Sequence, residues 1–163
     1  MPDRLLTIEQ VLTILAETPP RITALTTDLD PAHLHAKPNR DEWSANNILA
    51  HLRACADVWG HCIALIITQD KPTIRAINPR SWINSTNYLE QEFQPSLQAF
   101  TTQRADLLTL LEPLAHNDWS RTATITGAGK VLERTVHAYA QRLAEHERPH
   151  LKQMKRLVST IPH

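Results

Sequence analysis

Two histidines lie four residues apart near the C-terminus, in a pattern that otherwise calls for apolar side chains. The stripe of residues spaced three or four apart runs through Leu132, Val136, Tyr139, Leu143, His146, His150, Met154 and Leu157. Such spacing places all of them on one face of a helix. Burying an imidazole without a partner is costly. The pair therefore indicates either a metal site, since imidazoles one helical turn apart can bind one ion, or a hydrated bundle end where the rings bind neighbours.

A third histidine interrupts a second apolar stripe, formed by Ile48, His51, Cys55, Val58 and Cys62. Three imidazole nitrogens leave coordination positions vacant, as in catalytic rather than closed structural metal sites. We therefore predict that His51, His146 and His150 bind a divalent metal, whose identity stays open among zinc, nickel, iron and manganese. Cys55 is a possible fourth ligand, but a small core residue is the favoured interpretation. His61 and His137 fall off the ligand faces.

Residues 146–150 also read His-Glu-Arg-Pro-His, a formal match to the HExxH helix of zinc proteases, in which the glutamate is the general base. Pro149 removes the helical hydrogen bond to the Glu145 carbonyl, and the extended protease pattern does not follow. We therefore reject the protease interpretation. Glu147 could orient a ligand or accept a proton, but a solvated helix glutamate is the simpler expectation, and the general base stays unidentified.

Helices must position these residues, and prolines divide the chain into candidates at residues 7–17, 21–29, 44–69, 84–111 and 131–158. The first two, separated by Pro19-Pro20, are either two helices or one bent element. Ser44 is the expected N-cap of the third, with Trp43 packing on its first turn and largely buried. Pro95 either kinks the fourth or marks its true start. Residues 117–130 are expected to form an irregular or briefly extended connection.

Composition agrees with an all-α fold. The 163 residues include only three glycines, against a usual share of about 7%. Glycine-rich phosphate loops and β-rich architectures are therefore disfavoured. We predict a single domain over residues 1–163, folded as a four-helix bundle with long connections.

Charge and cysteine usage exclude several classes of function. Seventeen basic residues balance seventeen acidic ones, which argues against nucleic-acid binding. No apolar run approaches the roughly 20 residues of a membrane span, and the N-terminus has no signal-peptide core. Cys55 and Cys62, seven residues apart on one helix, would lie about 10 Å apart, too far for a disulfide. We expect reduced thiols and a cytoplasmic location.

The motifs around the histidines resemble those of DinB-like proteins. Trp43-Ser44 followed by Ile48-Leu49-Ala50-His51-Leu52 is similar to the second helix of that family. The run from Ala144 to Gln153 is similar to its last helix. It contains a histidine, three residues, a second histidine, then Leu151 and Gln153. Arg104 and Asp118-Trp119-Ser120-Arg121 fit the same pattern. The resemblance covers roughly residues 20–160.

The resemblance implies an up-down-down-up bundle, usually a homodimer, with a divalent metal on His51, His146 and His150. Characterised relatives include metal-dependent S-transferases that use mycothiol or bacillithiol, and a maleylpyruvate isomerase. It thus implies a thiol S-transferase or hydrolase acting on a small molecule, with a low-molecular-weight thiol as a possible partner. The alternative is a non-catalytic helical dimerisation or binding module with a structural metal or none.

Overall fold

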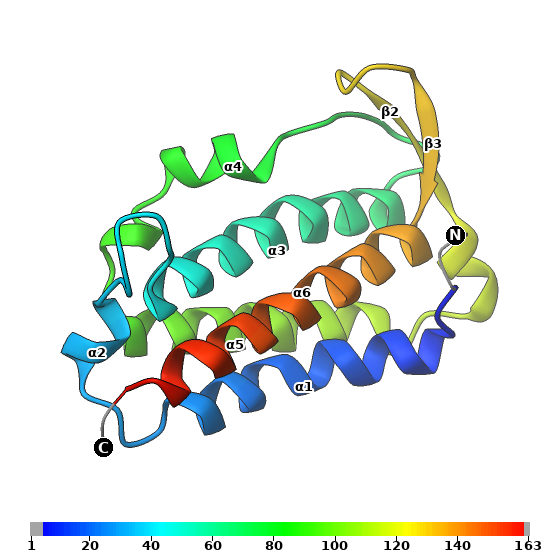
Figure 1. The fold of residues 1–163 in the computed structure, drawn as a ribbon. Helices are drawn as coiled ribbons and strands as arrows, with labels where there is room; N and C mark the ends of the chain where they lie inside the picture. The colour runs from blue at the N-terminus through cyan, green and yellow to red at the C-terminus, as the bar shows by residue number, and fades with distance from the viewer. Residues whose placement is uncertain (1–4, 162–163) are drawn as a thin grey trace.

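The computed structural model describes residues 5–161, and four long helices dominate it. They are α1 (Ile8–Thr26), α3 (Ala45–Thr68), α5 (Phe93–Leu111) and α6 (Val136–Ser159). The connections carry the short helices α2 (Pro31–His35) and α4 (Pro79–Trp82), and the single 3-10 turns Ile83–Ser85, Tyr88–Glu90 and His116–Ser120. In Figure 1, α3 and α5 run in one direction and α1 and α6 in the other. The predicted four-helix bundle of up-down-down-up order is confirmed.

α1 is one helix, although Pro19 and Pro20 lie inside it. Pro19 has no N–H to donate to the carbonyl of Leu15, four residues earlier. The guanidinium of Arg104 on α5 takes that place, with Nη1 2.9 Å from the Leu15 oxygen. The interruption predicted at the two prolines is absent because a side chain from another helix satisfies the freed carbonyl.

α3 and α5 begin at sequence signals. The Ser44 hydroxyl oxygen caps α3 by accepting a hydrogen bond from the Asn47 N–H, and the Ser44 N–H in turn donates to Oδ1 of Asn47. Pro95 lies in the first turn of α5, so it marks the start of that helix rather than a kink. α3 is long and apolar enough to pass for a membrane span, but 67% of its apolar window is buried inside the bundle, as in a core helix.

A small sheet replaces the start of the predicted last helix, and its second strand is the extended form of the connection predicted over residues 117–130. Its order is β1 (Thr73–Arg75), β2 (Thr122–Thr126) and β3 (Leu132–Thr135), and the central strand β2 is parallel to β1 and antiparallel to β3. Gly127 and Gly129, both with positive φ, form the turn between β2 and β3. The last helix therefore begins at Val136, not at residue 131, because Thr135 caps it. Leu132 belongs to β3 instead of the helical stripe.

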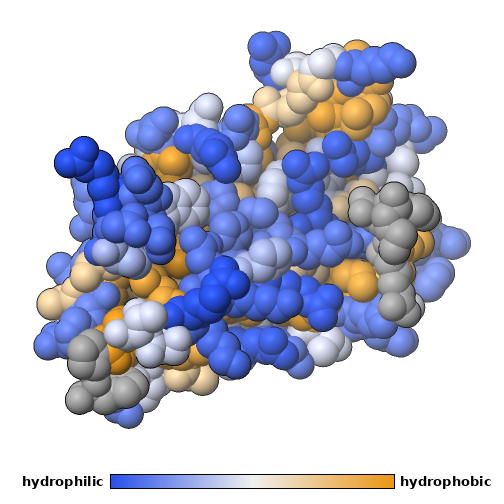
Figure 2. Space-filling model, viewed as in Figure 1, coloured by the Kyte–Doolittle hydropathy of each residue, from blue (hydrophilic) through white to orange (hydrophobic). Residues whose placement is uncertain are grey.

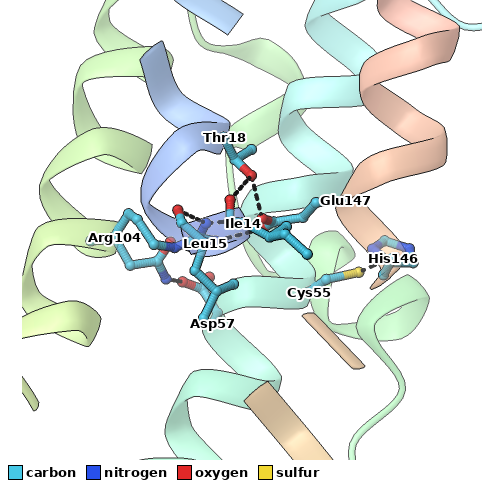
Figure 3. A network of polar contacts seen from close by, with 9 residues as sticks. Ile14, Leu15, Thr18, Cys55, Asp57, Arg104, His146 and Glu147 are labelled. Atoms are coloured by element: carbon cyan, nitrogen blue, oxygen red, sulfur yellow. Dashed lines mark hydrogen bonds and ion pairs between the residues drawn. The ribbon is translucent and has the colours of Figure 1, made fainter. Parts of the chain in front are cut away.

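A buried ion pair joins three of the four long helices (Figure 3). Glu147 on α6 is fully buried and accepts hydrogen bonds from both terminal nitrogens of Arg104 on α5. The Thr18 hydroxyl on α1 donates to the same carboxylate at 2.8 Å. The expectation of a solvated Glu147 is wrong. The carboxylate anchors α6 to α1 and α5. Because Glu147 faces these two helices, the adjacent residue His146 faces α3.

We expect Glu147→Ala to lower the free energy of unfolding by roughly 3–5 kcal/mol, because it leaves the Arg104 charge buried without a partner. The measurement is the urea midpoint at neutral pH. Glu145→Ala, at an exposed position of the same helix, is the matched control and should cost less than about 1 kcal/mol. The double variant Arg104→Met/Glu147→Leu should recover most of the loss. Equal midpoints for the two single variants would contradict the anchor.

Candidate metal centre

The structure brings His51 on α3 against His146 on α6, with their Nε2 atoms 3.0 Å apart. The Sγ atom of Cys55, one turn after His51, lies 3.7 Å from the first nitrogen and 3.9 Å from the second. The possible ligand atoms of His51, Cys55 and His146 all lie within 4.8 Å of one another. Two antiparallel helices thus supply a compact set of two nitrogens and one sulfur.

His150 lies beside this set. Its ring centroid is 4.9 Å from that of His51 and 4.7 Å from that of His146. Its Nδ1 lies 2.9 Å from Oε1 of Gln153, which is the acceptor in this pair. A proton held on Nδ1 leaves the lone pair of Nε2 for a metal, which is how outer partners commonly orient histidine ligands. In the sequence, Gln153 belonged to the family motif but had no assigned role. Its position three residues after His150 is the signal that could have indicated its contact with that ring.

Two tryptophans enclose the three rings. Trp43 stacks on His150 with an angle of 11° between the rings, and its centroid is 5.1 Å from that of His51. Trp59 meets His146 edge-on, at 5.2 Å and 90°. Trp43 packs against the bundle core as well as the histidines, but it is only partly buried, less than we predicted. The aromatic rings restrict the orientations that the imidazoles can take.

The donor set fits a divalent cation. Two metal–nitrogen bonds of about 2.1 Å meeting at roughly 90–110° hold their nitrogens about 3.0–3.4 Å apart. The separation between His51 and His146 lies at the short end of this range. The Nδ1 atom of His146 is buried and has no hydrogen-bond partner among residues 5–161, so the ring is not held by the paired contacts of a structural histidine.

Burial prepares the two nitrogens for coordination. Desolvation, followed by the charges of His150 and Arg80, lowers the pKa of His51 to about 4. Desolvation and the two other histidines lower the pKa of His146 to about 4 as well. Both imidazoles are therefore neutral at pH 7, the form that binds metals. Burial and the Glu147 charge raise the pKa of the Cys55 thiol to about 12, so Cys55 would have to lose a proton in order to bind.

The two histidines that the sequence placed off the ligand faces, His61 and His137, lie away from this site. His61 is exposed on α3, and Nε2 of His137 lies 2.8 Å from the Leu6 carbonyl oxygen. Glu147 follows His146 directly, but its carboxylate faces Arg104 and Thr18 on the far side of α6 (Figure 3). It cannot serve as the general base of an HExxH site, and the rejection of the protease interpretation is supported.

Sequence analysis missed two cations near the centre. The charges of Arg80 and Arg142 act on His146, and that of Arg80 also acts on His51. Arg142 lies one turn before His146 and places its guanidinium carbon 4.9 Å from the centre of the Trp59 ring. The four-residue step from Arg142 to His146 is a signal for Arg142. Arg80 lies on α4, far from both His51 and His146 in the chain, and only the fold brings it near them.

Comparisons with known proteins agree with this architecture. YfiT from Bacillus subtilis, described as a probable metal-dependent hydrolase with an unusual four-helix bundle topology, superposes with a TM-score of 0.78. The two are 16% identical, and the match covers 96% of this chain and 90% of that one, which shows a shared fold. No curated protein sequence matches the chain. The sequence model of the DinB superfamily matches residues 14–154, a span that contains all three histidines. The chain belongs to the DinB superfamily.

Proposed function

We propose that this protein is a divalent-metal-dependent enzyme of the thiol S-transferase type, with His51, His146 and His150 as metal ligands. The observation that carries the proposal is the meeting of three imidazole rings from two helices, each pair of centroids within 4.9 Å. Cys55 is the alternative third ligand, since its sulfur completes the tightest set of ligand atoms.

Neutral ligands favour activation of a nucleophile. Three imidazoles would leave the full charge of a divalent ion uncompensated, and such an ion supplies Lewis acidity that lowers the pKa of a thiol or of water. Arg80 and Arg142 add positive charge from the chain itself. No carboxylate within residues 5–161 hydrogen-bonds to the three rings, and Glu147 is neutralised by Arg104. The positive charge around the rings would therefore stabilise a thiolate or hydroxide. The described part of the chain offers no glutamate beside the rings to act as a general base.

A hydrolase is the second candidate, because YfiT is described as a probable metal-dependent hydrolase. Water would then take the place of the thiol at the same three ligands. The chain's own residues make no distinction between the two nucleophiles. A direct comparison of thiol-dependent and thiol-independent turnover separates them.

Two further expectations belong to the proposal. Cys55 and Cys62 are both buried free thiols, which suits a reducing compartment such as the cytoplasm. A homodimer is expected from the family resemblance. Neither expectation affects the assignment of the ligands.

The metal itself gives the first test. Nickel or zinc should raise the melting temperature of chelator-treated protein at pH 7, since a ligand that binds only the folded chain stabilises it by mass action. His51→Ala, His146→Ala and His150→Ala should each remove most of that increase, measured by differential scanning fluorimetry. His61→Ala, on the same helix as His51, is the matched control and should keep it.

Cys55→Ser separates the two ligand sets. With three histidines as ligands, this variant retains the metal-induced increase and His150→Ala loses it. The opposite pattern assigns the third position to Cys55. Retention of the full increase by His51→Ala would show that α3 contributes no ligand and that the centre is wrong.

The metal-free protein has a second signature, in its pH dependence. The pKa of His51 and of His146 is about 4 in the folded chain, against 6.5 for an ordinary histidine. The unfolded chain therefore binds more protons between these values, and the unfolding free energy should fall as pH falls from about 6.5 toward 4. In chelator, His51→Gln should show a shallower decline than wild type, and His61→Gln the same decline. Parallel curves for His51→Gln and wild type would refute the buried neutral state.

Turnover is tested with thiols and electrophiles. We expect the zinc- or nickel-loaded protein to accelerate consumption of mycothiol, bacillithiol or cysteine by monochlorobimane, and chelator or His146→Ala to abolish the acceleration. Metal-dependent hydrolysis of p-nitrophenyl acetate without any thiol would favour the hydrolase instead. Metal binding without either activity would leave the non-catalytic module as the function.

A further inference from the structure

A cavity of about 480 Å³ adjoins the metal centre, within the range of small-molecule sites. It lies between α3, α6, the β2–β3 hairpin and the segment that leads into α4. Figure 1 shows the hairpin and α4 on the same side of α3 and α6. A larger cavity of about 840 Å³ lies between α3 and α5, but within residues 5–161 no ring contact or hydrogen bond joins its lining to the three histidines.

Three cations from three separate elements line the smaller cavity: Lys130 from the hairpin turn, Arg134 from β3 and Arg142 from α6. Its lining contains no aspartate or glutamate. Within residues 5–161, none of the three cations forms an ion pair with a carboxylate. Arg134 and Arg142 instead lie over the rings of Tyr139 and Trp59, at 6.0 and 4.9 Å. Their guanidinium donors are therefore available to an anion.

Apart from Asn78, the rest of the lining is apolar or aromatic. Trp59 and Tyr139 are buried side chains of the lining, and Leu132 supplies a partly exposed apolar edge from the hairpin. Figure 2 shows hydrophobic residues gathered on that hairpin, above the mainly hydrophilic surface of α6. A ligand that fits such walls has an apolar or aromatic body as well as a charge.

Trp59 joins the cavity to the metal centre. The same ring that lines the cavity meets His146 edge-on at 5.2 Å, and Arg142 lies one turn before His146. A molecule held by the cations and packed against Trp59 is therefore separated from His146 by one indole ring. The same ring thus contacts both the cavity and one of the proposed metal ligands.

We propose that this cavity binds the electrophilic substrate, and that the substrate is a small organic carboxylate with an apolar or aromatic body. The inference rests on the proposed function, because it assigns the cavity to the reaction of the metal centre. Arg134 and Arg142 bind the carboxylate, since guanidinium groups match its two oxygens, while Trp59 and Tyr139 pack against the body. Lys130 adds a third positive charge at the entrance formed by the hairpin turn.

The test uses benzoate as the probe and benzamide, which has nearly the same shape without the charge, as its control. Binding is followed by ligand-observed NMR in 50 mM NaCl, first with chelator and then with zinc. We expect benzoate to bind at least tenfold more tightly than benzamide in both conditions. Arg134→Gln and Arg142→Gln should each weaken benzoate binding at least fivefold and leave benzamide unchanged. Arg148→Gln, an exposed cation of α6 outside the lining, should change neither. Phenyl phosphate in place of benzoate reports whether the same donors prefer a phosphate.

Each result bears on the proposal. Equal binding of benzoate and benzamide, or no binding of either, overturns it, as does benzoate binding that both arginine variants retain. Benzoate that binds only with zinc is a ligand of the metal and not of the cavity, and this result overturns the proposal. A tenfold preference for phenyl phosphate over benzoate overturns the carboxylate assignment and makes a phosphate ester the substrate class. A zinc-induced rise in melting temperature without selective benzoate binding removes this inference alone. Selective benzoate binding without any metal response leaves the anion site and removes the proposed function.

Discussion

The buried pair of Arg104 and Glu147 is the constraint on which the rest of the structure depends. Arg104 lies on α5 and Glu147 on α6, and both bind residues of α1, so one cluster joins three of the four long helices. Arg104 also satisfies the Leu15 carbonyl that Pro19 leaves free, which allows α1 to continue through two prolines. Since adjacent residues on a helix point about 100° apart, anchoring Glu147 toward α1 and α5 turns His146 toward α3. The site is thus oriented by a charge pair that takes no part in it.

The same arrangement separates charge across the bundle. The negative charge of Glu147 stays on the α1 and α5 side, bound to Arg104, while His51 and His146 remain neutral. Arg80 and Arg142 place positive charge on the other side of these rings. Within residues 5–161, no carboxylate hydrogen-bonds to the three rings, and the Glu147 charge, which acts on Cys55, is paired with Arg104. Positive charge also lines the neighbouring cavity, through Arg134 and Lys130, and this is the basis on which we propose that the cavity binds an anion.

Sequence periodicity was sufficient for the parts of the molecule governed by one helix at a time. The stripes on α3 and α6 identified His51, His146 and His150, and the structure brings their rings together; metal binding itself stays a prediction. The Ser44 cap was equally local. Periodicity failed where a distant partner decides the outcome. Nothing near Glu147 in the chain reveals Arg104, and nothing near Pro19 reveals the donor that replaces its lost hydrogen bond. The predicted extended stretch within residues 117–130 is β2, but its pairing with β1, some fifty residues earlier, is not visible in the local sequence.

The pairing of β1 with β2 also helps to build the cavity, because Ile125 of β2 lines it. The Ile74 and Ile125 side chains are buried, so the sheet is held against the core by β1 and β2. β3 pairs only with β2, and it carries Arg134 and Leu132 to the cavity while leading directly into the Thr135 cap of α6. The helices therefore position the three histidines that we propose as metal ligands, and the hairpin carries Arg134 and Leu132, two of the groups that line the cavity. Trp59 links the two sets, since its ring lines the cavity and contacts His146.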